Sequence, residues 1–358
     1  MSLLVEYGFQ TYQNNLDDYV VEENRSVARI IAQHKGRYNV ICEKGIIPAE
    51  LSGNYHYLLE EKGGYPVVGD YVYIAGESAD LAVIQDLLPR TSMFYRKDGW
   101  SKEGVQIMAS NFDTILLCTS LNRDFNITRL MRYMIMSNES NAKIAIVLTK
   151  SDLCSPEEAE EKVQLCKKRF PDVPVMVASA YTGDGLEQLN DYFKGTETVI
   201  LLGSSGVGKS SLVNAISGEE IMKVGAIREY DDKGRHTTVH RQIIKLPKGG
   251  VLIDTPGIRE IGLVNAQDGF NIVYDQIEQY AKLCKYNNCT HTHEDGCAIK
   301  QAIEDGEIDQ EQFDEYMKLL YENGYEENKE QFMFDKWQKS KQKSRDLRKA
   351  RKQKGKKH

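Results

Sequence analysis

The segment from Gly203 to Ser210 has the residue types and the spacing of a phosphate-binding loop. It matches G-x-x-x-x-G-K-[ST] and lies between the apolar residues Val199–Leu202 and a helix-like stretch that begins at Ser211. In such a loop, backbone N–H groups surround the β-phosphate, Lys209 spans the β- and γ-phosphates, and a serine hydroxyl holds Mg²⁺. A glycine-rich turn rarely matches by accident in this position. The segment therefore predicts nucleotide binding with Mg²⁺.

A second motif, Asp254–Gly257 (sequence DTPG), follows the apolar residues Val251–Ile253. A carboxylate at the end of that strand can reach Mg²⁺ through water, and the N–H of Gly257 can sense a γ-phosphate. Because Asp-x-Pro-Gly is also a common turn, the motif alone is ambiguous. Its place after the phosphate loop in the same domain favours a function beside the phosphates.

The segment Thr149–Asp152 (sequence TKSD) ends an apolar run and resembles the [NT]-K-x-D guanine motif. A carboxylate can accept both the N1–H and the 2-amino group of guanine, a pair that adenine does not present, and the stem of Lys150 can pack over the base. Ser179 and Ala180 also follow a strand and resemble the loop that contacts guanine O6. Thr149 stands where Asn is more usual, and a solvated helix entry is the alternative, so the case rests on the set of motifs.

Thiolate and imidazole side chains gather near the C-terminal third of the chain. Cys284, Cys289, His291 and Cys297 form a Cys₃His set suited to a closed tetrahedral Zn²⁺ site. His293 can substitute for His291, and reduced cysteines in a helical domain are the alternative. Such a site would supply folding energy to a subdomain too small to stabilise itself.

Strand-length apolar segments alternate with helix-length polar ones through the middle of the chain, which is typical of a parallel sheet covered by helices. One helix is marked at its start, because Ser155 can cap it, Pro156 suits its first position and Glu158 completes a capping box. The expected strands are Thr114–Cys118, Ile144–Leu148, Val173–Val177 and Val199–Leu202.

The regions before and after this central segment have different sequence patterns. Short alternating segments between about residues 27 and 88 suggest a small β-barrel, and a polar stretch from Arg90 to Val105 marks a domain boundary. After about Asn265 the chain is expected to be helical, with Gln310–Met333 as an acidic amphipathic segment.

Charge is distributed unevenly along the 358 residues. The formal net charge is -7, but residues 336–358 hold twelve Lys and Arg and one acid, so this tail is +11 and the remaining 335 residues are -18. Such a tail can neutralise several phosphates of a nucleic acid, and a solvated tail without a partner is the alternative.

The amino terminus has no basic region before an apolar stretch, and no window approaches 18 uninterrupted apolar residues. We therefore expect a cytoplasmic protein with no membrane partner. We also expect it to be a monomer. Seven cysteines, an odd number, without an export signal argue against a disulfide framework.

The order of the nucleotide motifs is unusual. In an ordinary GTPase the phosphate loop comes first and the guanine motif late, whereas here the guanine motif precedes both the phosphate loop and Asp254–Gly257. This is the order of a circular permutation, which costs little when the natural termini are adjacent at the surface. Whatever follows the domain is then attached directly to its nucleotide-sensing element.

Three features together resemble the ribosome small subunit-dependent GTPase A family (RsgA, also called YjeQ). They are the permuted order, the sequence GRHTT at Gly234–Thr238, and the spacing C-x₄-C-x-H-x₅-C from Cys284 to Cys297. The resemblance covers about residues 36 to 323. It implies a multidomain chain with an N-terminal OB-fold barrel that binds RNA, a circularly permuted α/β GTPase domain with a mostly parallel sheet, and a helical zinc-binding domain.

The resemblance also implies a role in late maturation of the small (30S) ribosomal subunit, with that subunit and its 16S rRNA as partners. The divisions we expect are an N-terminal extension (1–26), the OB-fold (27–103), the GTPase domain (104–265), the zinc-binding domain (266–335) and the basic tail (336–358).

By this resemblance Thr237 and Thr238 lie in the first switch, where the Thr238 hydroxyl would join Ser210 in the Mg²⁺ shell. A β-branched pair leading into a strand at Gln242 is the alternative. The family places its histidine ligand two residues after the second cysteine, which favours His291.

Ile258 follows Gly257, where Ras-like proteins carry the glutamine that orients the attacking water. Isoleucine cannot do this, so we expect slow hydrolysis by the protein alone, with the water positioned by another residue or by a partner. His236 is the candidate catalytic residue, and an exposed loop histidine without this role is the alternative.

The sequence therefore predicts a GTP hydrolase that binds GTP and GDP, docks on the small ribosomal subunit, is stimulated by it, and uses hydrolysis to drive its own release. One alternative is an ATPase or kinase unrelated to ribosomes, against which Asp152 argues. Another is a zinc- and OB-containing RNA-binding adaptor with nucleotide as a structural switch. The expected nucleotide-binding residues are Thr149, Lys150, Ser151, Asp152, Ser179, Ala180, Gly203, Ser204, Ser205, Gly206, Val207, Gly208, Lys209, Ser210, Ser211, Thr238, Asp254 and Gly257.

Overall fold

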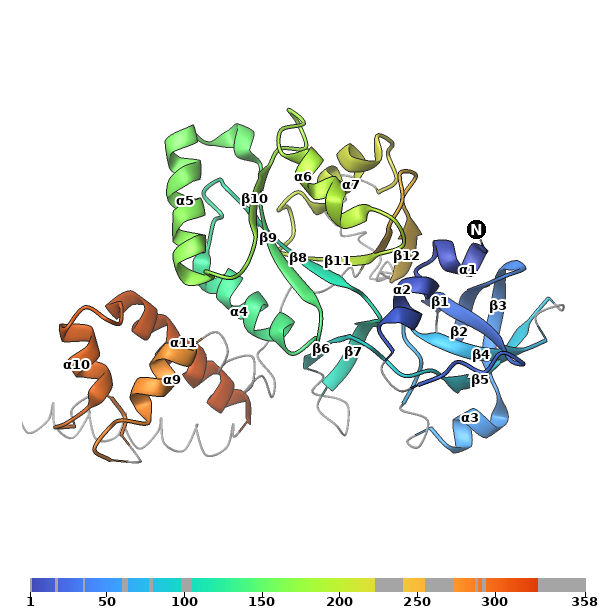
Figure 1. The fold of residues 1–358 in the computed structure, drawn as a ribbon, viewed down its shortest axis with the longest axis horizontal. Helices are drawn as coiled ribbons and strands as arrows, with labels where there is room; N and C mark the ends of the chain where they lie inside the picture. The colour runs from blue at the N-terminus through green and yellow to red at the C-terminus, as the bar shows by residue number, and fades with distance from the viewer. Residues whose placement is uncertain are drawn as a thin grey trace, which may run out of the picture. The chain divides into compact units, whose positions relative to one another are not determined.

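The computed structural model describes residues 2–16, 19–34, 36–59, 64–76, 80–97, 105–222, 241–254, 274–286, 289–291 and 294–327. The chain forms two compact units, Met1–Ile261 and Gly262–His358 (Figure 1). Within the described residues, no helix combines the length and the apolar character needed to cross a membrane.

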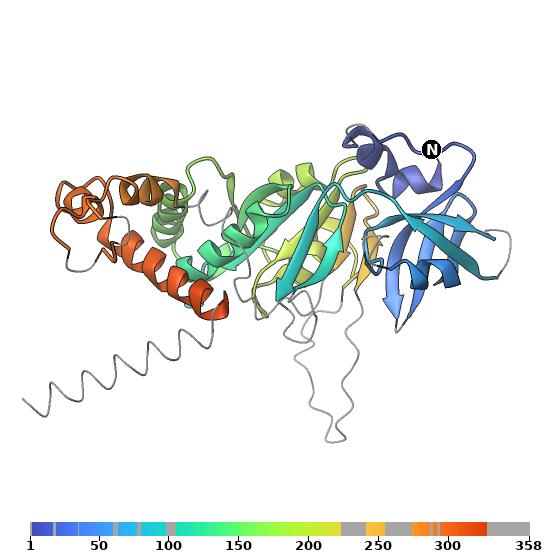
Figure 2. The same cartoon turned by 90° about the horizontal axis from the view of Figure 1, so that it is seen from below.

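Five strands of the first unit close into a barrel (Figures 1 and 2). β1 pairs with both β2 and β4, β2 pairs with β3, and β5 joins β3 to β4, so the ring is complete. Ile30, Val40 and Ile84 are fully buried in its core. The expected β-barrel is confirmed. Its elements are β1 (Ser26–His34), β2 (Arg37–Cys42), β3 (Gly45–Leu51), the short helix α3 (Gly53–Tyr57), β4 (Tyr71–Ala75) and β5 (Ala82–Leu87).

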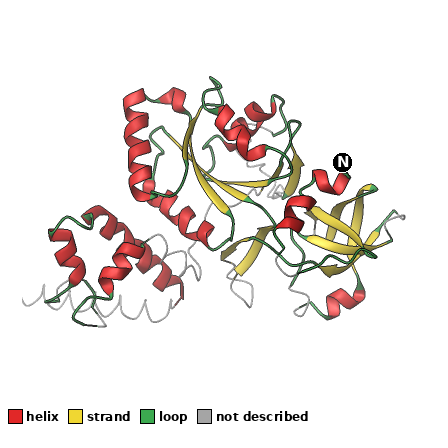
Figure 3. Cartoon of the chain, viewed as in Figure 1, coloured by secondary structure: helices red, strands yellow, loops and turns green. Residues whose placement is uncertain are grey.

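The central sheet has the strand order β10-β9-β8-β11-β13-β12, with every neighbouring pair parallel except β12 and β13. Every residue of β8 and β11 is buried, which explains their continuous apolar sequences. Helices cover both faces (Figure 3). The elements are β8 (Thr114–Ser120), α4 (Ile127–Asn138), β9 (Lys143–Thr149), α5 (Pro156–Arg169), β10 (Val175–Ala178), α6 (Leu186–Asn190), β11 (Thr198–Leu202), α7 (Lys209–Ser217), β12 (Gln242–Lys245) and β13 (Val251–Asp254).

Helix α5 begins as its sequence indicates. The Ser155 hydroxyl accepts a hydrogen bond from the Glu158 backbone N–H (3.2 Å), and the Glu158 carboxylate accepts one from the Ser155 N–H (3.1 Å). Both halves of the capping box are therefore present, with Pro156 in the first turn. Strand β10 begins later than the sequence indicated, after Pro174, which has no N–H to donate to a ladder.

Two features connect the barrel to the central sheet. β1 pairs with β12 through Ala32 and Gln242, so one 11-stranded sheet runs through both. A hairpin of β6 (Met93–Lys97) and β7 (Val105–Ser110) occupies the chain between them. The domain bounds given above remain predictions.

The N-terminal residues form two short helices, α1 (Leu3–Glu6) and α2 (Phe9–Asn14), which lie beside both the barrel and the sheet (Figures 1 and 2). The Tyr12 hydroxyl donates to the Pro89 carbonyl (2.8 Å), and the Thr11 and Thr196 hydroxyls are 2.7 Å apart. These contacts attach the N-terminal extension to the chain after β5 and to the segment that leads into β11.

A buried arginine reinforces this junction. Arg29 of β1 is fully buried, and its guanidinium donates to the Thr198 hydroxyl (2.9 Å) and to the Asn111 carbonyl (2.7 Å). Its side chain also packs on the Tyr71 ring. Because Thr198 begins β11, the strand that leads into the phosphate loop is tied to the barrel.

The second unit is helical in its described residues, as expected. Tyr274 and Phe313 both pack against Tyr316, and Ile277 and Ile299 are buried. The helices are α9 (Asp275–Ala281), α10 (Ala298–Glu304) and α11 (Gln310–Glu327). The basic tail, residues 336–358, lies outside the described residues.

Candidate nucleotide site and metal centre

The phosphate loop lies where its sequence predicts, between β11 and α7. Gly203 has a φ of +155°, and a side chain there would meet the Cys118 carbonyl oxygen at 2.4 Å, so the loop must carry glycine to pass β8 this closely. Gly208, with a φ of +102°, turns the chain into α7 in a conformation that favours glycine. Burial raises the pKa of the Cys118 thiol below the loop to about 12, so this cysteine stays protonated.

The lysine of the loop folds back over it. The Lys209 ammonium donates to the carbonyls of Gly203 (2.6 Å) and Ser204 (2.9 Å). These carbonyls hold the cation beside the loop, at the position from which it can reach β- and γ-phosphates. Ser210 and Ser211 follow in the first turn of α7.

The guanine motif contacts the phosphate loop directly. Lys150 has a left-handed backbone conformation (φ +60°), and its ammonium donates to the Gly206 carbonyl (2.6 Å). The Thr149 hydroxyl donates to the Val207 carbonyl (2.5 Å). This bond and the one from Lys150 join the two motifs, so threonine contributes to the link at a position where asparagine is more usual.

The predicted base-recognition residues also lie together. The Ser179 hydroxyl donates to a carboxylate oxygen of Asp152 (2.5 Å) and accepts from the backbone N–H groups of Tyr181 and Thr182 (3.1 Å each). Asp152 is exposed and is held by Ser179, while Ala180 continues the same loop. The carboxylate is therefore oriented at the edge of the site and keeps a second oxygen for a ligand.

Asp254 is the last residue of β13, and the pKa of its carboxyl is shifted. Burial raises the pKa of its carboxyl to about 6, and the nearby Lys209 ammonium opposes part of this rise. In the described part of the chain no hydrogen bond supports the carboxylate. A half-buried carboxylate beside a lysine fits a group that would hold Mg²⁺ through water.

We predict that Asp254→Asn stabilises the nucleotide-free protein at pH 7.5 while weakening Mg²⁺-dependent GTP binding. The native carboxyl binds its proton more tightly than in the unfolded chain, so the free energy of unfolding falls as pH rises from about 4 to about 6. Removing the charge should restore about 3 kcal/mol at pH 7.5 and less than about 1 kcal/mol at pH 4. Urea unfolding at both pH values measures this, with Asp172→Asn, an exposed acid, as the matched control. Equal gains at the two pH values would contradict the assignment.

Several predicted residues lie outside the described part of the chain. They are Thr237, Thr238, His236, Gly257, Ile258 and His293. Their roles remain predictions.

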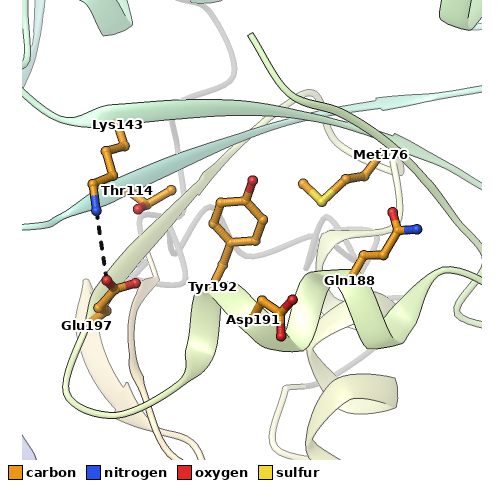
Figure 4. A pocket seen from close by; sticks show the side chains of 7 residues that line it. All are labelled: Thr114, Lys143, Met176, Gln188, Asp191, Tyr192 and Glu197. Atoms are coloured by element: carbon orange, nitrogen blue, oxygen red, sulfur yellow. Dashed lines mark ion pairs between the residues drawn. The ribbon is translucent and has the colours of Figure 1, made fainter.

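The cavity in Figure 4 lies elsewhere. It has a volume of about 360 Å³ and is lined by Thr114 and Lys143, which begin β8 and β9, and by Tyr192. A Lys143–Glu197 ion pair (4.0 Å) lies at its side. The nucleotide motifs instead follow the carboxyl ends of the strands, where ligands bind in open α/β sheets. The cavity therefore contains none of the predicted site residues.

The cysteine and histidine side chains of the second unit converge as predicted. One ligand atom from each of Cys284, Cys289, His291 and Cys297 lies within 4.8 Å of the others. Cys284 Sγ is 3.9 Å from Cys297 Sγ, and His291 Nδ1 is 3.6 and 3.5 Å from these two sulfurs. Tetrahedral Zn²⁺, with Zn–S bonds of about 2.3 Å, requires S–S separations of about 3.8 Å and S–N separations of about 3.6 Å. The four residues thus form a site that fits a metal ion.

The histidine of this site is suited to bind metal. Burial lowers its pKa, which favours the neutral imidazole that a metal requires. Its ring also packs edge-on against Phe313 of α11, with centroids 6.3 Å apart. The site therefore connects the loop before α10 to the long C-terminal helix.

Known proteins resemble this chain over most of its length. The family model "RsgA GTPase" matches residues 87–264. "Small ribosomal subunit biogenesis GTPase RsgA 2" of Lactiplantibacillus plantarum is 39% identical over 90% of each chain. A protein of Methanosarcina acetivorans, "Small ribosomal subunit biogenesis GTPase RsgA", is 40% identical over 84% of this chain and 80% of its own. The chain belongs to the RsgA GTPase family. Its predicted family and its predicted enzyme class, GTP hydrolase, are confirmed.

Solved structures support the fold of this RsgA family member. YjeQ from Thermotoga maritima has a TM-score of 0.62 at 24% identity, covering 83% of this chain and 98% of its own. YloQ, described as a circularly permuted GTPase, has a TM-score of 0.59 at 25% identity, covering 86% and 97%. A model described as "ABC transporter" also matches residues 186–349. That range includes the phosphate loop, which many nucleotide hydrolases share.

One side chain at the phosphate loop was missed by the sequence reasoning. Arg129, in the first turn of α4, donates to the Ser204 hydroxyl (3.0 Å). It belongs to no motif and lies 75 residues from its partner, so a single sequence carries no signal for it.

Proposed function

We propose that this protein is a GTPase of small ribosomal subunit biogenesis whose turnover is stimulated by that subunit. The observation that carries the nucleotide part is the direct contact between the guanine motif and the phosphate loop, from Lys150 to Gly206. The relatives support the ribosomal part, because proteins 36–40% identical to this chain are named for small ribosomal subunit biogenesis.

Each residue of the site has a defined task in hydrolysis. Asp152 accepts the N1–H and 2-amino groups of guanine, and the Ala180 N–H faces O6. The loop from Gly203 to Gly208 surrounds the β-phosphate, while Lys209 reaches the β- and γ-phosphates. Ser210, Thr238 and Asp254 would hold Mg²⁺, which when bound neutralises charge on the β- and γ-phosphates.

The attacking water needs a partner for its proton and its orientation. We assign this to His236, because the Ile258 side chain has no polar atom to orient water. Water attacks the γ-phosphorus, the bond to the β–γ bridging oxygen breaks, and its electron pair remains on GDP. A first switch that is completed only on the ribosome would account for stimulation by the subunit.

The remaining parts serve docking. We assign zinc to Cys284, Cys289, His291 and Cys297, and contact with 16S rRNA to the barrel (27–103) and to the basic tail (336–358). The protein then acts in the cytoplasm as a monomer that leaves the subunit after hydrolysis.

The test is GTP hydrolysis by the purified protein with and without small ribosomal subunits at fixed salt. We expect slow turnover alone and stimulation of at least about 10³-fold with subunits, as a partner that completes a GTPase site can provide. ATP in place of GTP is the control. Absence of stimulation with nucleotide and zinc bound would favour the adaptor function, and equal use of ATP would favour the ATPase or kinase.

A further inference from the structure

Arg129 occupies a fixed position beside the phosphate loop. It lies in the first turn of α4, where the Asn126 side chain caps the helix by accepting a hydrogen bond from the Arg129 backbone N–H (2.7 Å). Its guanidinium is half-buried and donates to the Ser204 hydroxyl (3.0 Å). The cap thus fixes the backbone from which the side chain extends.

The loop that precedes α4 is fixed to the nucleotide site as well. The Leu121 N–H donates to the Thr149 carbonyl (2.8 Å), and the Lys162 ammonium donates to the Leu121 carbonyl (2.6 Å). Thr149 in turn contacts the phosphate loop at Val207. Arg129 is therefore preorganised relative to both the guanine motif and the phosphate loop.

Within the described residues the charge of Arg129 is not neutralised by a carboxylate. Among residues whose structure is described, no carboxylate forms an ion pair with it, and its side chain makes one hydrogen bond, to Ser204. A guanidinium has five N–H donors in a planar fork that matches the oxygens of a phosphate. Lys209 reaches the carbonyl of the same Ser204, so two cations converge on one residue of the loop.

The geometry points to Arg129 as a catalytic residue that contacts the terminal phosphate of GTP and is supplied by this chain itself. This inference rests on the proposed GTPase function. As water bonds to the γ-phosphorus and the bond to the GDP oxygen breaks, charge spreads over the γ-phosphate oxygens, and the guanidinium adds donors there. Ser204 holds the guanidinium beside the loop when no phosphate is bound.

A purely supporting role makes a different prediction. If Arg129 acts only by holding the loop through the Ser204 hydroxyl, then Ser204→Ala removes the same interaction and has the same effect. If Arg129 contacts phosphate, its own removal costs much more. A double-mutant cycle of the two residues separates these cases.

The test compares Arg129→Ala, Arg129→Lys, Ser204→Ala and the double variant in single-turnover GTP hydrolysis without ribosomal subunits. We expect Arg129→Ala to lower the rate about 100-fold, and Ser204→Ala to lower it by less than about threefold. Arg129→Lys should recover part of the rate, and added guanidinium ion should rescue Arg129→Ala. Arg123→Ala, which removes an exposed charge from the loop that precedes α4, is the matched control.

Binding supplies a second readout that does not depend on turnover. Arg129→Ala should lose affinity for a non-hydrolysable GTP analogue about tenfold while its GDP affinity stays unchanged. Equal losses for both nucleotides, or a double variant no worse than Ser204→Ala, would overturn the inference. A wild-type protein that binds GTP without hydrolysing it would contradict the proposed function alone, because the analogue-to-GDP ratio still tests Arg129.

Discussion

Replacing Asp152 by Asn is expected to transfer the preference of this protein from guanine to xanthine nucleotides. The Asp152 carboxylate offers acceptors only, whereas an amide offers one acceptor and one donor. Xanthine carries a carbonyl where guanine carries the 2-amino group, so the donor gains a partner with xanthine and opposes another donor with guanine. GTP affinity should fall about 10³-fold and XTP affinity should rise by a similar factor. Titration of fluorescent, non-hydrolysable GTP and XTP analogues measures both.

Asp152→Asn should change base recognition without disturbing the loop around it. The Ser179 hydroxyl donates to an oxygen of Asp152, and the amide oxygen of asparagine can accept the same bond, so the loop keeps its support. Asp172→Asn, which removes an exposed acid after α5, is the control and should leave both affinities unchanged. If Asp152→Asn binds GTP with normal affinity and gains no affinity for XTP, Asp152 does not recognise guanine, and the alternative ATPase or kinase function is favoured.

The parts of the site that the sequence predicted correctly are local. The phosphate loop is eight consecutive residues whose glycines, lysine and serine each have a task that depends on the adjacent strand and helix. The capping box of α5 is likewise complete within four residues, and both of its hydrogen bonds form. Such features need no knowledge of distant segments, because the backbone that positions them is the backbone that carries them.

The parts that the sequence could not supply depend on contacts between distant residues. The Arg129 contact with Ser204 joins the first turn of one helix to a loop after another strand. The N-terminal helices, for which the family resemblance gave no expectation, are fixed by bonds such as Thr11 to Thr196. Periodicity and motif spacing report neither, because both depend on how the folded segments meet.

The threonine of the guanine motif shows that a residue that departs from a pattern can still contribute to the site. From sequence, Thr149 only weakened the match to the motif. In the structure its hydroxyl bonds the Val207 carbonyl and so joins the base side of the site to the phosphate side. The contribution of Thr149 thus depends on the neighbouring loop, which the motif does not contain.

The metal cluster was predictable because its members span only 14 residues. We expect Cys284→Ser to release zinc and to unfold the C-terminal unit, Gly262–His358. The structural metal supplies about 10 kcal/mol or more of binding free energy in small zinc domains, more than the helices α9 and α10, of seven residues each, supply alone. Zinc content by metal analysis, helical circular dichroism and proteolysis of the full chain measure the loss.

The nucleotide site provides the internal control for this variant. GTP affinity should stay near the wild-type value, because the phosphate loop and Asp152 belong to the other unit, Met1–Ile261. Cys154→Ser, which changes a half-buried thiol of that unit, should retain one equivalent of zinc and the full helical signal. A Cys284→Ser protein that keeps its zinc and resists proteolysis would show that Cys284 is no ligand. Wild-type protein with less than about half an equivalent of zinc would instead favour the alternative, in which the cysteines are reduced and bind no metal in a helical domain.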